Sequence, residues 1–276
     1  MRTRVITAIV MVAVMIPFFV FSETLAFPIL MALLGAVGVF EMQGCIGTKG
    51  HLIASVPPML LAAGLPFLVR YGNVETVFDY LFPLAFALIA FELIVAVFSG
   101  KTFGVESAAL SGATGVYIAF GFASVVMLRD LPYGQYVYFL AFIIPWVTDT
   151  FAYFSGRLFG KHKLIPEVSP KKTVEGSVGG TLFAVILTVL YGFVVGRISS
   201  AKPDYLALAI VATVVSLLSQ CGDLVMSLVK RRFGIKDYGK LFPGHGGVLD
   251  RFDSIVCTAP FLYFLAALVP ILHLFS

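Results

Sequence analysis

Long apolar runs separated by short polar segments make up most of this chain. Nine of these runs have about the 20 residues needed to cross the hydrocarbon core of a bilayer as a helix. They cover residues 5–21, 25–41, 52–69, 77–99, 107–128, 134–155, 177–198, 205–228 and 255–275. Because a backbone exposed to lipid must satisfy its own hydrogen bonds, each run is expected to be helical. The pattern predicts an all-α, polytopic integral membrane protein with nine transmembrane helices.

The amino-acid composition supports this class and excludes others. Hydrophobic residues make up 59% of the chain, charged residues make up 12%, and the mean hydropathy is +0.99, which exceeds what a water-soluble domain tolerates. The three cysteines, Cys45, Cys221 and Cys257, are scattered, so they indicate neither a disulfide framework nor a metal-binding motif. The net charge of +4 is small, and the basic residues of the chain are concentrated in a few loops, so no nucleic-acid partner is expected.

The basic residues predict the orientation of the helices. With a cytoplasmic N-terminus, 15 of the 19 Lys and Arg residues face the cytoplasm, as the positive-inside rule expects. The two richest loops, 156–176 and 229–254, then lie on that side. We therefore expect a multi-pass protein of the cell (inner) membrane whose active site faces the cytoplasm, with N-terminal transmembrane helices in 1–130 and a catalytic part in 131–276. The first run lacks a small-residue cleavage site and is expected to remain a membrane helix.

The loop at 156–176 combines basic residues with glycines and prolines. Within it, Ser169 and Thr173 place hydroxyl groups beside the paired Lys171 and Lys172, and such donors suit phosphate. The loop is therefore a candidate for binding a polyanion. The alternative is that its charges serve only membrane topology or attraction to anionic lipids.

The segment between the last two runs adds further basic candidates. Lys230, Arg231 and Lys236 are suited to holding phosphates, and Ser227 lies one turn before the first two, where its hydroxyl can bond the same ligand. A nucleophilic role for Ser227 is not expected, because no base and elbow motif accompanies it.

Four aspartates give candidate metal ligands. Asp250 and Asp253 are three residues apart, a spacing that puts both carboxylates on one face of a helix. Asp223 and Asp149 are expected at the cytoplasmic ends of two other helices, so the four acids can converge. Ligation by oxygen alone favours Mg²⁺ or Mn²⁺ over zinc. The alternative is that Asp250 and Asp253 only form ion pairs with nearby basic residues such as Arg251.

A glycine-rich turn lies between these acidic and basic residues. Gly246 and Gly247 allow the backbone to approach a ligand closely and to point amide hydrogens at phosphate oxygens. His245 has two interpretations, either stabilising pyrophosphate as an imidazolium or acting as a structural turn residue.

These residues form motifs with a recognisable order. The motifs are Ser169-Pro170-Lys171-Lys172-Thr173-x-Glu175-Gly176, Ser227-x-x-Lys230-Arg231, Lys236-Asp237, Pro243-Gly244-His245-Gly246-Gly247 and Asp250-Arg251-x-Asp253. Together they resemble the signature of phosphatidate cytidylyltransferases, also called CDP-diacylglycerol synthases. The resemblance covers residues 149–254, whereas the N-terminal half matches only as hydrophobic spans. Leucine is more usual than Cys221 in that family, glutamate more usual than Met226, and a small residue more usual than Phe151.

The resemblance implies a nucleotidyltransferase of phospholipid biosynthesis that works among membrane lipids. CTP and phosphatidic acid are its implied substrates, Mg²⁺ or Mn²⁺ its implied cofactor, and a second cation and a homodimer are left open. The implied catalytic residues are Asp223, Lys230, Arg231, Asp250 and Asp253, and the implied metal ligands are Asp149, Asp223, Asp250 and Asp253. The implied substrate-binding residues are Ser169, Lys171, Lys172, Thr173, Ser227, Lys236, Asp237, His245, Gly246, Gly247 and Arg251.

Other functions fit the sequence less well. An ion-coupled secondary transporter also carries intramembrane acids and Gly/Pro-interrupted helices, but its charges lie at the midplane in matching halves, and here they gather at one rim. A CDP-alcohol phosphotransferase needs an Asp-Gly…Ala-Arg…Asp…Asp pattern that is absent from this sequence. A membrane scaffold has no need of a charge-dense, glycine-punctuated loop.

Overall fold

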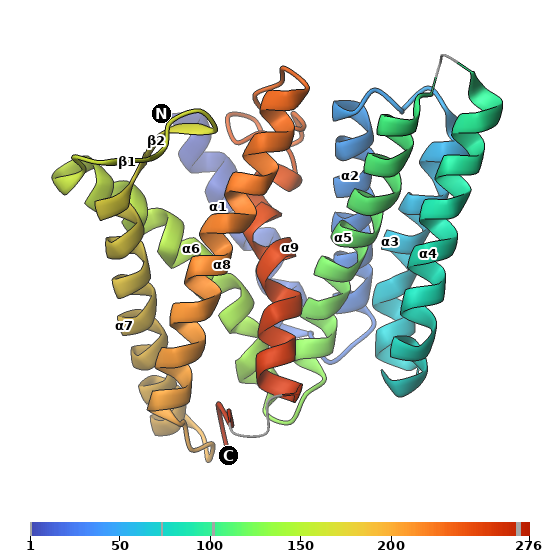
Figure 1. Cartoon of the computed structure of the whole chain (residues 1–276). Coiled ribbons are helices and arrows are strands. Elements are labelled where there is room, and N and C mark those ends of the chain that lie inside the picture. The colour runs from blue at the N-terminus through green and yellow to red at the C-terminus, as the bar shows by residue number, and fades with distance from the viewer. Residues whose placement is uncertain (1, 73, 101–102, 269–271) are drawn as a thin grey trace. The chain divides into compact units, whose positions relative to one another are not determined.

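Helices dominate this computed structural model, which describes residues 2–72, 74–100, 103–268 and 272–276 (Figure 1). Within these ranges the α-helices are α1 (Arg2–Val20), α2 (Ala26–Cys45), α3 (Leu52–Tyr71), α4 (Val74–Ser99), α5 (Val105–Arg129), α6 (Gly134–Phe159), α7 (Val174–Ile198), α8 (Tyr205–Arg232) and α9 (Leu249–Tyr263). In the described part of the chain, seven helices, α2 to α8, are long and apolar enough to cross a membrane. The prediction of a polytopic, helical membrane protein is therefore confirmed.

The first of two compact units comprises Met1–Met127 and Arg232–Phe252. Its helices pack closely where glycines leave room. A Cβ on Gly115 of α5 would lie 2.7 Å from Pro58 Cβ of α3, and a Cβ on Gly112 would lie 3.0 Å from Ile89 Cα of α4. Small residues that let helix backbones approach are the usual means of packing helices in a bilayer.

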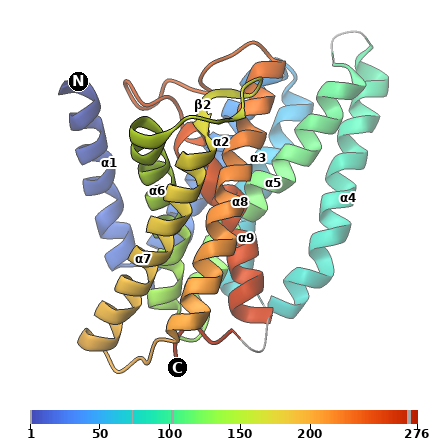
Figure 2. The same cartoon turned by 60° about the vertical axis from the view of Figure 1, so that its left-hand side comes forward.

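The second unit comprises Leu128–Arg231 and Asp253–Ser276. Here α6 and α7 are in close contact along their lengths (Figure 2). Gly176 and Gly180 form a Gly-x-x-x-Gly face on α7, and a Cβ on either would lie 2.7 Å from a carbonyl oxygen of α6, that of Ala152 or Thr148. The spacing of small residues therefore sets the distance between these two helices.

Buried hydroxyl groups connect three helices in the interior of the second unit. Thr148 Oγ1 of α6 donates to Ser216 Oγ of α8 at 2.9 Å, and Ser216 donates to Thr181 Oγ1 of α7 at 3.1 Å. Gln220 Nε2 also donates to Thr181 Oγ1, at 3.2 Å. These hydrogen bonds fix the rotation of α6 and α8. They involve Thr148, one residue before Asp149, and Gln220, three residues before Asp223.

Three predicted boundaries are wrong in an informative way. Helices α6 and α8 extend beyond the apolar runs 134–155 and 205–228, to Phe159 and Arg232, so Asp149 and Asp223 lie inside helices and not at their ends. The run 255–275 is also displaced, because α9 begins at Leu249 and continues through a π-helical turn (Phe264–Leu268).

Residues 272–276 are not helical, although the last predicted run extends to residue 275. Backbone hydrogen bonds connect Ser276 to Lys202 at 2.7 and 2.9 Å and Leu274 to Asp204 at 3.1 Å, which draws this segment to the loop before α8. Residues 269–271 of the same run lie outside the described residues. A functional division of the chain at residue 130 stays a prediction.

Candidate functional site

A short β-hairpin occupies the loop between α6 and α7, where the sequence predicted no strand. Strands β1 (Lys163–Ile165) and β2 (Ser169–Thr173) pair antiparallel, with Lys163 opposite Thr173. Thr173 then caps α7, because its Oγ1 accepts a hydrogen bond from the backbone N–H of Gly176 at 3.1 Å. The hairpin therefore ends on a fixed helix N-terminus.

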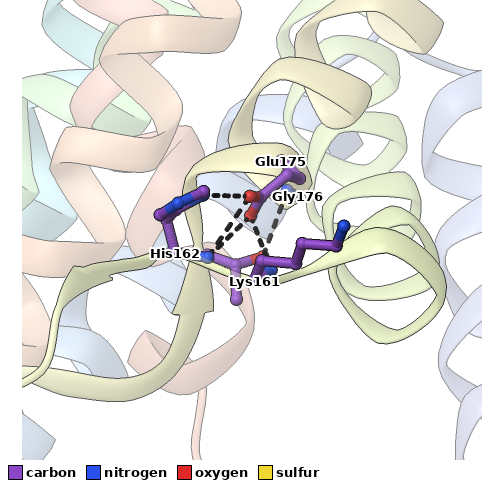
Figure 3. Close-up of polar contacts among 5 residues, drawn as sticks. Lys161, His162, Glu175 and Gly176 are labelled. Carbon is purple, nitrogen blue, oxygen red and sulfur yellow. Dashed lines mark hydrogen bonds and ion pairs between the residues drawn. The ribbon is translucent and has the colours of Figure 1, made fainter.

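Glu175, in the first turn of α7, holds the beginning of the same hairpin (Figure 3). Its carboxylate accepts hydrogen bonds from the backbone N–H groups of Lys161 at 3.1 Å and His162 at 3.2 Å, and it lies 2.6 Å from His162 Nδ1. An acid in this position also interacts favourably with the helix dipole. Both ends of the segment that carries Lys171 and Lys172 are thus anchored to α7.

A cavity of about 350 Å³ lies beside the hairpin within the second unit. Its polar lining comes from α6, β2, α7 and α8, and consists of Asp149, Tyr153, Arg157, Lys171, Lys172, Thr173, Ser177, Gln220 and Asp223. Lys172 Nζ forms an ion pair with Asp223 Oδ2 at 2.5 Å, and the two side chains are 24% and 25% exposed. The cavity therefore presents both signs of charge, as binding of a metal-chelated polyphosphate requires.

Asp253 joins the acids of this cavity in one electrostatic cluster. It lies near the start of α9, before the predicted apolar run 255–275 begins, and is 7% exposed. Burial, and then repulsion from Asp223, raise the pKa of Asp253; Asp149 adds to this repulsion, whereas the Lys230 ammonium opposes it. Carboxylates of α6 and α8 thus act electrostatically on Asp253 of α9, and a metal site shared by the three acids stays a prediction.

The described residues include no group of three or more His, Cys, Asp or Glu side chains arranged to hold a metal ion. The chemistry of the cluster nevertheless fits a hard divalent cation, because its donors are carboxylate oxygens and their mutual repulsion needs a positive charge. Lys172 supplies that charge to Asp223 in this structure.

The other predicted residues of α8 and the hairpin differ in exposure. Lys230 is buried at 9% exposure, Ser227 and Ser169 are half-buried, and Arg231 and Lys171 are exposed. In the first unit, Lys236 and Asp237 are exposed. Two departures from the family pattern concern packing: Met226 is 1% exposed, and the Phe151 ring stacks on Phe183 with centroids 4.1 Å apart.

The glycine turn, which we define as residues 243–247, lies in the first unit. Gly244 and Gly246 have positive φ angles of 77° and 84°, a conformation that favours glycine. The His245 backbone oxygen accepts a hydrogen bond from Arg251 Nε at 2.8 Å, whereas its buried Nδ1 has no hydrogen-bond partner among the described residues. Both Arg251 and the turn itself are therefore in defined positions.

Asp250 has a structural function in this turn that the sequence did not indicate. Its Oδ2 accepts hydrogen bonds from the backbone N–H groups of Tyr238 at 2.8 Å and Gly247 at 2.9 Å. The Gly247 amide is thus already engaged by protein, contrary to the expectation that it points at a phosphate. A metal-binding role for Asp250 stays a prediction.

Glu41 of α2 is the residue of this region that the sequence interpretation missed. It is 5% exposed, and its Oε1 and Oε2 accept hydrogen bonds from the backbone N–H groups of Val248 at 3.0 Å and Leu249 at 2.9 Å. The signal was present, since a single carboxylate at the end of an apolar run is costly to place in a membrane and marks a functional position.

Comparisons with known proteins identify the family of this chain. A model of the cytidylyltransferase family matches residues 2–269. The phosphatidate cytidylyltransferase of Bacillus subtilis (strain 168) is 36% identical over 274 residues, which cover 97% of this chain and 98% of the relative. The enzymes of the same name from Staphylococcus saprophyticus and Staphylococcus aureus (strain COL) are 36% and 32% identical, over 95% of this chain and 97% of each relative. The chain therefore belongs to the cytidylyltransferase family.

Proposed function

We propose that this protein transfers CMP from CTP to phosphatidic acid, giving CDP-diacylglycerol and pyrophosphate. The observation that carries the proposal is the cavity of the second unit, where Lys171 and Lys172 face Asp149 and Asp223. The full-length similarity to enzymes named phosphatidate cytidylyltransferase supports the same reaction. A transporter would have no use for a lysine hairpin anchored at both ends beside a cluster of acids.

The reaction needs positioning and charge neutralisation more than a general base. An oxygen of the phosphatidate phosphate attacks the α-phosphorus of CTP, a new P–O–P bridge forms, and the bond to the β-phosphate breaks to release pyrophosphate. Because a phosphate monoester has a second pKa of about 6, the attacking oxygen is already anionic near neutral pH. Two anions must therefore be brought together, which is costly without cations in the site.

Basic side chains of this chain would supply part of that neutralisation. Lys171 and Lys172 line the cavity and would bind the triphosphate, and Lys230 is buried close to Asp253. Arg231 follows on the same helix, and exposed Lys236 would contact the leaving pyrophosphate. Of these charges, that of buried Lys230 acts most strongly, since water screens a buried charge less than an exposed one.

Four further groups would orient the substrates. The hydroxyl groups of Ser169 and Ser227 would donate to phosphate oxygens, and the unused Nδ1 of His245 would bond the nucleotide or the phosphatidate headgroup. Arg251 would hold the backbone of the glycine turn through its bond to the His245 oxygen.

Asp223 and Asp253, with Asp149 beside them, would hold a Mg²⁺ ion, which would supply positive charge to offset the charge of the phosphates. In this proposal Lys172 leaves Asp223 when the site is loaded and turns to the phosphates. Mn²⁺ would accept the same oxygen ligands as Mg²⁺. A second cation is compatible with the four predicted acids, Asp149, Asp223, Asp250 and Asp253.

The lipid substrate explains why the site is built on membrane helices. Large apolar side chains of α7, including Val178, Leu182 and Ile186, are exposed on its surface at 64%, 55% and 48%. Such an apolar surface is stable in contact with lipid hydrocarbon, so the acyl chains of phosphatidic acid can remain in the bilayer while its phosphate reaches the cavity. We place this site on the cytoplasmic side, where CTP is available.

Purified protein incubated with labelled CTP, Mg²⁺ and phosphatidic acid tests the proposal. We expect a labelled liponucleotide to form together with one equivalent of pyrophosphate. The matched control is Asp223→Asn, which keeps the size of the side chain and removes the charge. Absence of a labelled lipid with the wild-type protein would reject the assignment, and equal yields from both proteins would remove Asp223 from the site.

A further inference from the structure

The glycine turn is held by two carboxylates of the first unit that come from distant parts of the chain. Asp250 accepts hydrogen bonds from the N–H groups of Tyr238, which precedes the turn, and of Gly247, its last residue. Glu41 binds those of Val248 and Leu249, which are 207 and 208 residues away in sequence. Consecutive amides from Gly247 to Leu249 are thus all engaged by side-chain oxygens of the protein.

Glu41 fits its position so closely that neighbouring residues must lack side chains. A Cβ built on Gly239 or on Gly247 would overlap with Glu41 Oε1. Neither glycine has a positive φ angle, so space and not backbone conformation requires glycine at these two places. The Glu41 carboxylate is therefore enclosed by the backbone that it binds.

Helix α9 begins at Leu249, so Glu41 occupies the N-terminus of this helix. The free N–H groups of a helix N-terminus form a ready anion site, and phosphate often binds there. In this chain a carboxylate of the protein fills that site. The amides of Val248 and Leu249 are consequently not donors to substrate, and their role is to fix the turn.

We infer that Glu41 is a positioning residue, which holds the glycine turn and the first turn of α9 in one conformation. It contacts no reacting atom in this scheme and acts through the backbone of residues 247–249. The inference rests on the proposed function only for its kinetic readout.

The kinetic test uses the full-length protein purified in detergent micelles. Glu41→Ala should raise the Michaelis constant for CTP or for phosphatidic acid about tenfold, because two charge-assisted hydrogen bonds to the turn are lost. Trypsin should also cleave faster after exposed Lys240, since the segment that Glu41 holds becomes mobile. If the alanine variant does not fold, Glu41→Gln keeps the volume and one acceptor oxygen and should show a smaller change in both readouts.

Gln43→Ala is the matched control. Gln43 lies on the same helix, is 1% exposed, and donates through Nε2 to the Ser55 oxygen at 2.9 Å, not to the turn. Its loss should lower the thermal midpoint while both Michaelis constants and cleavage at Lys240 stay within twofold of wild type. A folded Glu41 variant that behaves like this control would overturn the inference.

A thermal-midpoint cycle tests the enclosure without any activity. Gly247→Ala should lower the midpoint strongly in the wild-type background and less in the Glu41→Ala background, where the methyl group has room. Equal decreases in the two backgrounds would contradict the packing described here. If the wild-type protein makes no liponucleotide, the proposed function fails, and the trypsin and thermal-midpoint results decide the role of Glu41 by themselves.

Discussion

Replacement of Lys172 by glutamine should weaken substrate binding more than the same change at Lys171. The two lysines are adjacent on β2 and both line the cavity, but Lys172 is 24% exposed and paired with Asp223, whereas Lys171 is exposed. A charge-assisted hydrogen bond in a partly desolvated site contributes about 1.5–3 kcal/mol, and an exposed ion pair contributes about 0–1 kcal/mol.

These energies give different changes in the Michaelis constant for CTP. Since about 1.4 kcal/mol corresponds to a factor of ten, Lys172→Gln should raise the constant about 10- to 100-fold, and Lys171→Gln by a factor of about 5 at most. The assay varies labelled CTP at saturating phosphatidic acid and fixed Mg²⁺, and counts the labelled lipid.

The same pair of variants reports on competition at Asp223. Because Lys172 neutralises Asp223 in this structure, its removal should lower the Mg²⁺ concentration that gives half-maximal activity, whereas Lys171→Gln should leave that concentration unchanged. Equal Michaelis constants in the two variants would refute the distinction drawn from their exposure. Unchanged constants for both substrates in both variants would return the hairpin to a role in topology alone.

Three further predictions concern the acids, the helix contact and the hairpin anchor. Asp253→Asn should abolish transfer and leave the protein folded, as seen by gel filtration in detergent. Asp250→Ala should lower both activity and the thermal midpoint, because two backbone N–H groups lose their acceptor. Full turnover by either variant would contradict the role given to that aspartate. Gly180→Ala should lower the thermal midpoint by several degrees, since its Cβ would lie 2.7 Å from an α6 carbonyl oxygen. The control Gly64→Ala, whose Cβ would meet nothing within 4 Å, should leave the midpoint unchanged. Equal midpoints in the two variants would argue against close packing of α6 and α7. Glu175→Gln should weaken the anchor of the hairpin and raise the Michaelis constant for CTP, and an unchanged constant would show that Thr173 suffices.

The helices could be predicted from the sequence because eight of the nine apolar runs coincide with most of a helix, and the ninth overlaps the C-terminal part of α9. Their ends could not, since amphipathic last turns carry polar residues: α6 continues through Arg157 and α8 through Arg232. The hairpin was missed for a different reason. Its five-residue strand β2, with Pro170 and two lysines, has no alternation of apolar and polar residues to indicate a strand.

The candidate site was predicted in part. The three-residue spacing paired Asp253 with Asp250, and Asp223 and Asp149 were expected beside them as residues at helix ends. In the structure it is Asp223 and Asp149 that repel Asp253. Sequence spacing could not show that Asp250 binds backbone amides, because that depends on the path of the chain around the glycine turn. Nor could it connect Glu41 with Leu249, since a contact across 208 residues follows only from the fold.

The discontinuity of the first unit has a consequence for biosynthesis. Residues 232–252 belong to the same unit as residues 1–127, yet the ribosome makes them only after most of the second unit. Until then the Glu41 carboxylate stands in a nascent membrane segment without the two amides that later receive it. A polypeptide interrupted before α9 would leave the Glu41 side chain without these two hydrogen-bond donors, so the packing around this residue of α2 depends on one of the last segments to emerge.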